Sequence, residues 1–150
     1  MRLNFLSVPD LSAFKARGGK LIMYHGWSDN LIMPQGTTRY YERVKQTMGD
    51  VSDFSRLYMV GGMGHCSGGT NVDQFGQGSS GVVPREPTTD VFRALMAWSE
   101  KGVAPRELVA SRIAAGVVTR TRPLCPYPQV AKYKGSGSTD EAANFSCTSP

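Results

Sequence analysis

Short apolar runs and helix-like repeats alternate along the first part of the chain. Residues 20–25 and 55–60 are apolar runs closely followed by glycine, and this pattern predicts buried strands. Between the two runs, apolar side chains recur at helical spacing, which predicts a helix that begins near Pro34 and ends at Gly49. The apolar face of this helix comprises Tyr40, Tyr41, Val44 and Met48.

A second helix is predicted after the second strand, beyond a long loop. Residues 70–87 are rich in Gly, Ser, Pro and Gln without periodicity, which predicts a surface loop. Thr88 or Thr89 is expected to cap the helix, with Asp90 in its first turn, where the helix dipole favours a negative charge. Gly102 ends the helix. The expected buried face comprises Val91, Phe92, Leu95, Met96 and Trp98.

The repeated order of strand, loop and helix is typical of a parallel α/β sheet. Beyond it, residues 108–113 and 117–122 predict two short strands joined as a hairpin. Residues 123–150 are rich in Pro, Gly and Ser and show little periodicity, so an irregular tail is expected. Apolar burial alone cannot hold such a tail in place, whereas a covalent bond would.

Composition and charge limit the classes of partner. The 150 residues are 40% hydrophobic, which is enough for the core of one domain. Lys and Arg total 17 against 12 Asp and Glu, but these charges are scattered, so we expect no nucleic-acid or membrane-surface partner. No apolar run is long enough to span a membrane, and residues 1–7 lack the apolar segment of a signal peptide.

Two residues with acid–base chemistry follow the two predicted strands. Asp29 comes after the first strand and His65 after the second, 36 residues later. The carboxyl ends of adjacent parallel strands meet at one edge of a sheet, so the two loops are expected to lie side by side. An Asp that accepts a hydrogen bond from one imidazole nitrogen leaves the other nitrogen to act as a base. Asp followed by His is also the order of these residues in α/β-hydrolases.

Other roles for the same residues stay open at this point. An Asp after a strand is commonly a turn residue or a helix cap, and a His in a glycine-rich loop is commonly a solvated surface group. His25, at the end of the first strand, is expected to be structural rather than catalytic. A zinc site made of His25, His65 and Cys66 is conceivable, but these residues lack the paired ligand spacing of such sites.

The nucleophile that an Asp–His pair would activate is not found in the sequence. No Gly-x-Ser-x-Gly motif occurs in the 150 residues. Ser67 shares a loop with His65 and lacks the strand-to-helix turn that would expose its hydroxyl, so it is not expected to serve. Cys66 is excluded for a similar reason, because immediate neighbours in sequence rarely reach the geometry for proton transfer. The chain therefore has a base and its orienting acid but nothing for them to activate.

Long motifs along the chain carry a family resemblance. They lie at residues 18–29, 34–37, 40–41, 60–66 and 121–128. On these motifs the chain resembles the tannase and feruloyl esterase family of α/β-hydrolases from about residue 10 to residue 147, over the carboxyl-terminal portion of that family only. The resemblance implies a partial α/β-hydrolase fold. Residues 1–122 would be the carboxyl-terminal part of the catalytic domain, and residues 123–150 its disulfide-closed tail.

The activity that the resemblance implies is that of a serine carboxylesterase acting on aromatic-acid esters, such as feruloyl, galloyl and terephthalate esters. Asp29 matches the family's triad aspartate and His65 its triad histidine. The family's serine lies upstream, in a Cys-Ser motif that precedes the matching region and is distinct from Cys66-Ser67, so the chain alone is expected to be inactive. The lid domain, which carries the family's structural calcium site, is also missing, so no cofactor is expected in this chain.

The resemblance also gives each cysteine a role. Cys125 and Cys147 match the family's carboxyl-terminal disulfide, which would close the tail. Cys66 matches a cysteine whose partner lies just before the absent serine. Two free thiols in a cytosolic protein are the alternative for Cys125 and Cys147. With the disulfides, the full-length protein is expected to be secreted or periplasmic, although residues 1–7 supply no signal peptide.

Two further functions stay open beside the esterase. The chain is alternatively a non-catalytic half that needs a serine-bearing partner chain, or a small binding domain with an unrelated ligand. An incomplete parallel sheet exposes a strand edge, through which an amino-terminal half or a second copy of the chain would pair. In the esterase interpretation, the substrate is a small aromatic ester.

Overall fold

A pair of parallel strands forms the centre of the fold. The computed structural model describes residues 8–78 and 81–150. β1 (Leu21–Gly26) and β2 (Ser55–Val60) pair in a parallel register that runs from Leu21 opposite Ser55 to Gly26 opposite Val60. In the described part of the chain β1 pairs with β2 alone, so no strand lies along its other edge. The expectation about residues 1–7 falls outside the described residues.

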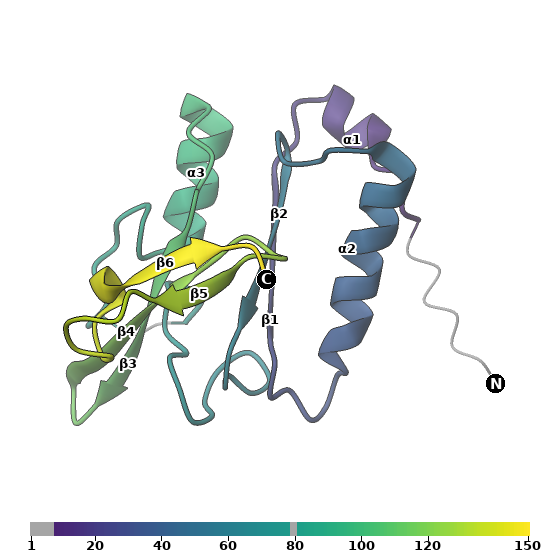
Figure 1. The fold of residues 1–150 in the computed structure, drawn as a ribbon. Helices are drawn as coiled ribbons and strands as arrows, with labels where there is room; N and C mark the ends of the chain where they lie inside the picture. The colour runs from purple at the N-terminus through teal and green to yellow at the C-terminus, as the bar shows by residue number, and fades with distance from the viewer. Residues whose placement is uncertain (1–7, 79–80) are drawn as a thin grey trace.

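Helices cover both faces of this strand pair. α2 (Pro34–Met48) lies on one side and α3 (Val91–Lys101) on the other, and the short α1 (Ser12–Ala16) precedes β1 (Figure 1). The two predicted strand–helix units are therefore confirmed. They give the parallel α/β arrangement in which functional groups gather at the carboxyl ends of the strands.

The strand pair separates two hydrophobic cores. On the side of α2, Leu57 of β2 packs with Val44 of the helix, and both are fully buried. On the side of α3, Tyr58 and Val60 pack with Ala94. Successive side chains of a strand point to opposite faces, so β2 contributes alternate residues to the two cores. Burial on both faces is typical of a parallel sheet.

α2 has the predicted ends. Pro34 lies in the first turn, where its missing N–H removes no intrahelical hydrogen bond. Gly49 follows the last turn with φ of +78°, a conformation that favours glycine, and its N–H donates to the carbonyl of Lys45 at 2.8 Å. Tyr41 and Val44 of the predicted face are buried.

The amino-terminal cap of α3 differs from the prediction. The cap is Asp90, not Thr88 or Thr89, because Oδ1 of Asp90 accepts hydrogen bonds from the N–H groups of Phe92 at 2.9 Å and Arg93 at 3.0 Å. The backbone of Asp90 is extended, as a capping residue requires, so the helix begins one residue after it.

The buried face of α3 is also narrower than predicted. Trp98 is buried as expected, and Ala94, which precedes it by one turn, is buried beside it. Phe92 is 58% exposed, so its place in the predicted face was wrong. At 100° per residue, Phe92 lies on the opposite side of the helix from Ala94.

The segment between β2 and α3 is a loop, but it is not confined to the surface as predicted. Its described residues form no helix or strand longer than an isolated bridge. However, Val72, Phe75 and Val83 are buried. Phe75 packs edge-on against Tyr24 of β1 with ring centroids 5.1 Å apart. The loop therefore fills part of the core on the α3 side of the sheet.

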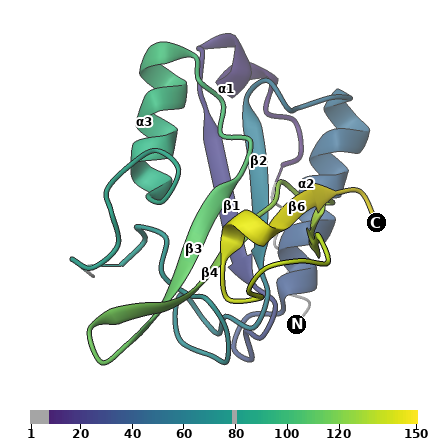
Figure 2. The same cartoon turned by 60° about the vertical axis from the view of Figure 1, so that its left-hand side comes forward.

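Two antiparallel hairpins complete the fold. β3 (Leu108–Ala114) and β4 (Val117–Leu124) form the predicted hairpin, extended by a residue or two at its ends (Figure 2). β5 (Val130–Tyr133) and β6 (Phe145–Thr148) form a second one, with the 3₁₀ turn η1 (Ala142–Asn144) before β6. The expectation of an irregular tail was therefore wrong, because strands of four residues are too short to show a periodicity.

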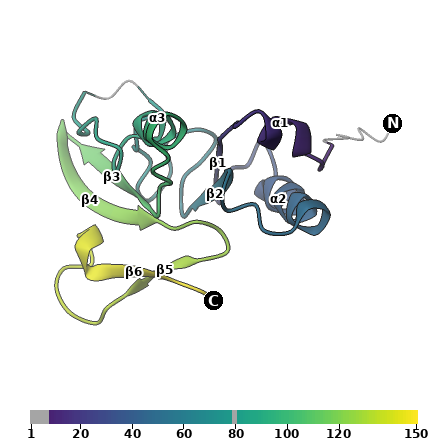
Figure 3. The same cartoon turned by 90° about the horizontal axis from the view of Figure 1, so that it is seen from above.

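The tail hairpin is fixed against β4. Seen from above, the β3–β4 hairpin lies between α3 and the β5–β6 hairpin (Figure 3). A disulfide joins Cys125, just after β4, to Cys147 in β6, with Cα atoms 5.5 Å apart. The guanidinium of Arg122 lies 3.9 Å from the ring centroid of Phe145 and adds a cation–π contact. The predicted pairing of Cys125 with Cys147 is confirmed.

Candidate active site

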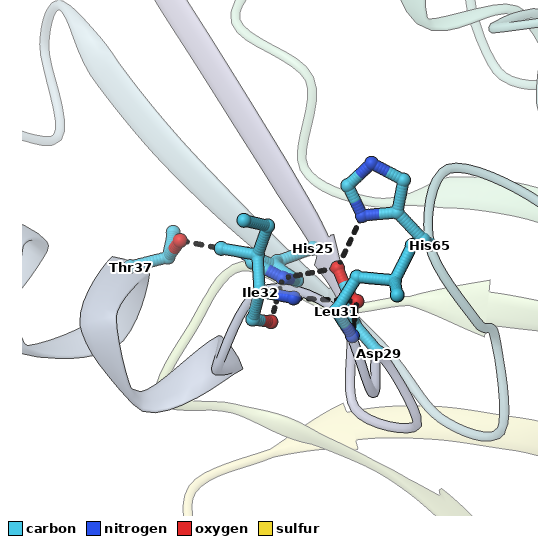
Figure 4. Close-up of polar contacts among 6 residues, drawn as sticks. All are labelled: His25, Asp29, Leu31, Ile32, Thr37 and His65. Atoms are coloured by element: carbon cyan, nitrogen blue, oxygen red, sulfur yellow. Dashed lines mark hydrogen bonds and ion pairs between the residues drawn. The ribbon is translucent and has the colours of Figure 1, made fainter.

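The carboxyl ends of β1 and β2 bring an acid and a base into contact. Gly26 and Val60 are the last residues of the two strands and lie opposite each other, so the loops that follow leave the same edge of the sheet. Nδ1 of His65 lies 2.8 Å from Oδ2 of Asp29 (Figure 4). The structure thus brings together the two side chains that the sequence places after neighbouring strands.

Asp29 is a buried carboxylate with hydrogen bonds to both oxygens. The N–H groups of Leu31 and Ile32 donate to Oδ1 at 2.8 and 3.0 Å. Oδ2 contacts His65 at 2.8 Å and His25 at 3.0 Å. Burial raises the pKa of the Asp29 carboxyl. These hydrogen bonds together outweigh the effect of burial and hold the pKa well below its usual range, and the N–H of Ile32 makes the largest contribution among them. Asp29 is therefore an anion at neutral pH.

His65 is held by one ring nitrogen and presents the other. An ionised carboxylate only accepts hydrogen bonds, so Nδ1 of His65 carries the hydrogen that it shares with Asp29. In the neutral ring, Nε2 is then the basic nitrogen. No described residue makes a hydrogen bond to Nε2, and the side chain is 44% exposed. This is the tautomer that accepts a proton from an approaching hydroxyl.

Backbone hydrogen bonds join the two loops that carry the pair. The N–H of Trp27 donates to the carbonyl of Val60 at 2.9 Å, and the N–H of Ser28 donates to the carbonyl of Met63 at 3.0 Å. The first bond continues the parallel ladder past the end of the strands. The relative position of Asp29 and His65 is therefore set by main-chain contacts as well as by their own hydrogen bond.

A small cavity adjoins the pair. Its volume is about 120 Å³, which is room for a few atoms of a reacting group beside the imidazole. Large apolar side chains are exposed close by: Leu31 and Met33 are each 71% exposed, and Ile32 is 56% exposed. The cavity is lined by Tyr24, His25, Gly26, Asp29, Ile32, Met63, His65 and Cys66.

The rejected nucleophiles and the zinc site gain no support from the geometry. Ser67 is exposed on the loop of His65, and no hydrogen bond joins its hydroxyl to the imidazole among the described residues. Cys66 is an exposed free thiol with φ of +64°. No group of three His, Cys, Asp or Glu side chains in residues 8–78 and 81–150 is arranged to hold a metal ion.

His25 has a larger part in the site than the sequence indicated. Its Nε2 lies 3.0 Å from Oδ2 of Asp29, so one carboxylate oxygen contacts two imidazoles (Figure 4). Sequence reasoning assigned His25 a structural role and missed this contact. The four-residue spacing between His25 and Asp29 was the available signal, but that spacing has a fixed meaning only in a helix.

Comparison with known proteins agrees with this architecture. The family described as tannase and feruloyl esterase matches residues 6–148. Over 144 residues the chain is 45% identical to a mono(2-hydroxyethyl) terephthalate hydrolase from Piscinibacter sakaiensis, covering 94% of this chain and 22% of that protein. It is 39% identical over 145 residues to a probable feruloyl esterase B-2 from Neosartorya fischeri, covering 92% of this chain and 28% of the relative.

Solved structures show the same fold. Feruloyl esterase B from Aspergillus oryzae superposes with a TM-score of 0.87 at 31% identity, over 93% of this chain and 29% of that one. The chain shares its fold with this esterase structure. Its parallel strands with helices on both faces place the fold in the α/β-hydrolase-like class. More particularly, the chain belongs to the tannase and feruloyl esterase family.

The chain spans about a quarter of the length of the relatives it matches, with 22%, 28% and 29% covered in the three cases above. The named relatives are ester hydrolases. Among the described residues, no helix is long and apolar enough to cross a membrane.

Proposed function

We propose that this chain supplies the acid–base half of a serine ester hydrolase, with His65 as general base and Asp29 as its orienting carboxylate. One observation carries the proposal. Nδ1 of His65 is bound to a buried, ionised Asp29 at 2.8 Å, while Nε2 is left without a partner among the described residues. Family membership supports it, because the named relatives are esterases.

The proposed reaction needs a serine from outside these 150 residues. Nε2 of His65 takes the hydroxyl proton while the serine oxygen attacks the ester carbonyl carbon. The resulting imidazolium is stabilised by the charge of Asp29, and its proton goes to the leaving alkoxide oxygen as the ester C–O bond breaks. In the second half, Nε2 takes a proton from water, whose oxygen attacks the acyl-serine. That proton returns to the serine oxygen as the acid is released.

We propose aromatic-acid esters as the substrate class. Two of the named relatives act on terephthalate and feruloyl esters by their names. In this chain, Leu31, Ile32 and Met33 present exposed apolar surface within a few residues of Asp29. Such a surface suits an aromatic ring next to the scissile bond.

The proposed chemistry uses side chains and water alone. We place the calcium site implied by the family resemblance outside this chain, in the lid domain. No cluster of three His, Cys, Asp or Glu residues in the described ranges fits such an ion. The disulfide between Cys125 and Cys147 supports a secreted or periplasmic location.

The partner in this proposal is the polypeptide that carries the serine. The free edge of β1 is where a further parallel strand of that polypeptide would pair, since β1 has a strand on one side only in the described chain. Cys66 is free and exposed next to His65, so it is open to a cysteine beside the incoming serine. In an oxidising compartment the two thiols would form a disulfide, and an external disulfide or other thiol oxidant would take up the two electrons and two protons. The alternative is that the chain is a non-catalytic module, which associates with a partner chain or with a second copy of itself through the same edge.

Turnover of methyl ferulate tests the proposal. The 150-residue chain alone should show none, and mixing it with a polypeptide of this family that carries the upstream Cys-Ser segment should produce turnover. The same mixture made with His65→Ala should stay inactive. Turnover by the chain alone that His65→Ala abolishes would show that a nucleophile lies within these residues. A folded, stable mixed complex without any turnover would favour the non-catalytic module.

A further inference from the structure

His25 lies inside the hydrogen-bond network of the candidate site. It is the fifth residue of β1, and its side chain is 12% exposed. Nε2 contacts Oδ2 of Asp29 at 3.0 Å and the carbonyl oxygen of Ile32 at 3.2 Å. Nδ1 lies 2.7 Å from Oγ1 of Thr37, in the first turns of α2. The ring therefore connects the strand, the loop of Asp29 and the helix (Figure 4).

The partners of His25 determine its protonation pattern. A carboxylate oxygen and a peptide carbonyl can only accept hydrogen bonds, so Nε2 of His25 carries a hydrogen shared between Asp29 and Ile32. In the neutral ring, the hydrogen on Nε2 leaves Nδ1 as an acceptor, and the Thr37 hydroxyl 2.7 Å away is the donor beside it. These partners fit a neutral imidazole in the Nε2–H tautomer.

A neutral donor has a specific advantage beside a catalytic carboxylate. The N–H groups of Leu31 and Ile32 fix Oδ1 of Asp29. Oδ2 contacts His65, the group that it orients, and also His25. The Nε2–H of His25 therefore holds Oδ2 independently of His65 and without adding a positive charge. The negative charge of Asp29 then remains available to the imidazolium that forms on His65.

We propose that His25 is a positioning residue whose Nε2–H holds Oδ2 of Asp29 toward His65. In this proposal, the Thr37 hydroxyl keeps His25 in the Nε2–H tautomer. The proposal deepens the function proposed above and rests on it for its catalytic consequence. The hydrogen-bond geometry itself does not depend on that function, so it has a test of its own.

The tautomer is tested by NMR on the 150-residue chain with ¹⁵N-labelled histidine. We expect His25 as the neutral Nε2–H tautomer at neutral pH and a low-field proton on Nδ1 of His65. His25→Gln keeps an N–H donor near the place of Nε2, so the low-field proton should persist. It should be lost in His25→Phe, which fills the space without a donor. A His25 ring with its hydrogen on Nδ1, or a low-field proton unchanged in His25→Phe, would overturn the proposal.

The catalytic consequence is tested in the assembled enzyme that contains the serine. His25→Phe should lower kcat on the order of 100-fold with KM little changed, because a misdirected carboxylate affects the reacting groups and not ground-state binding. His25→Gln should recover most of that loss, within about tenfold of the unchanged enzyme. Equal losses in kcat for the two variants, in step with equal losses in thermal stability, would show a structural role only.

Thr37→Val provides a second route if a His25 variant does not fold. It removes the hydroxyl at constant shape, so the ¹⁵N spectrum should show His25 leaving the single Nε2–H tautomer and kcat should fall. Thr47→Val, at the exposed far end of α2, is the matched control and should change neither. An unchanged tautomer and kcat in Thr37→Val would contradict the proposal. If the assembled enzyme hydrolyses no ester at all, the proposed function fails, and the NMR result alone then decides on His25.

Discussion

Gly26 lies directly against the backbone carbonyl of Met63. A Cβ atom at Gly26 would overlap the carbonyl oxygens of Met63 and of Gly64. Gly26 is the last residue of β1 and comes three residues before Asp29, while Met63 comes two residues before His65. The close approach of these two backbones therefore brings the acid and the base within hydrogen-bond distance.

Gly26→Ala should separate the two loops. Overpacking against backbone atoms that cannot turn aside is expected to cost about 1–3 kcal/mol of stability. Urea unfolding followed by circular dichroism measures this cost. Gly36→Ala is the matched control, since Gly36 lies in α2 with nothing within 4 Å of its added Cβ. It should stabilise the chain by about 0.4–1 kcal/mol. Equal effects at the two positions would contradict the close contact at Gly26.

Asp29 should make stability depend on acid pH. Its pKa is lower in the folded chain than in the unfolded chain, so the folded chain takes up its proton less readily. The stabilisation that the ionised Asp29 carboxylate gives to the folded chain is complete above the ordinary aspartate pKa of about 3.9. It is lost as the pH falls from there toward the lower pKa of Asp29 in the folded chain. Urea unfolding at pH 6 and pH 3 should therefore show a smaller pH-dependent loss in Asp29→Asn than in the unchanged chain. The same loss in both would show that Asp29 is not held as an anion.

The tail disulfide should stabilise the whole chain. Its cysteines are 22 residues apart, and closing a loop of that length is worth about 3 kcal/mol in the chain-entropy estimate. Replacing Cys125 and Cys147 together with serine should lower the free energy of unfolding by up to that amount. Cys66→Ser, at an exposed free thiol, should change it by less than about 0.5 kcal/mol. A double replacement without effect would indicate that the β5–β6 hairpin holds itself.

Asp90 should stabilise the amino-terminal end of α3 through its side-chain cap. Asp90→Ala removes the acceptor of two backbone N–H groups, at a cost of about 1–2 kcal/mol. Asp90→Asn keeps a capping oxygen and should lose much less, although Oδ2 also accepts from Arg85 at 3.1 Å. Thermal unfolding of the two variants distinguishes the cap from a charge effect. Equal destabilisation would assign the role of Asp90 to its contact with Arg85.

The elements with a clear period were predictable from the sequence. The apolar runs that became β1 and β2 and the four-residue repeat around Tyr41 and Val44 needed only local information. Because parallel strands align their carboxyl ends, the meeting of Asp29 with His65 also followed from chain order. Motif resemblance, and not spacing, supplied the pairing of Cys125 with Cys147.

Features that depend on tertiary contacts were not predictable in this way. Strands β5 and β6 have four residues each, which is too short to show a periodic pattern. They are held by pairing with each other and by the disulfide. Phe75 lies in a loop without periodicity and is buried because it packs into the core on the α3 side of the sheet, where its ring contacts that of Tyr24. His25 resembles any polar residue at a strand end until the loop after it turns Asp29 back toward its ring.

The central claim is that Asp29 and His65 work as one unit on an external serine. Its most direct test is hydrolysis of methyl ferulate by the assembled enzyme carrying His65→Ala, Asp29→Asn, or both. Each single variant should lose several orders of magnitude in kcat, and the double variant should be no slower than His65→Ala alone, because members of a triad are not additive. Losses that multiply in the double variant, or a single variant with full activity, would contradict the claim.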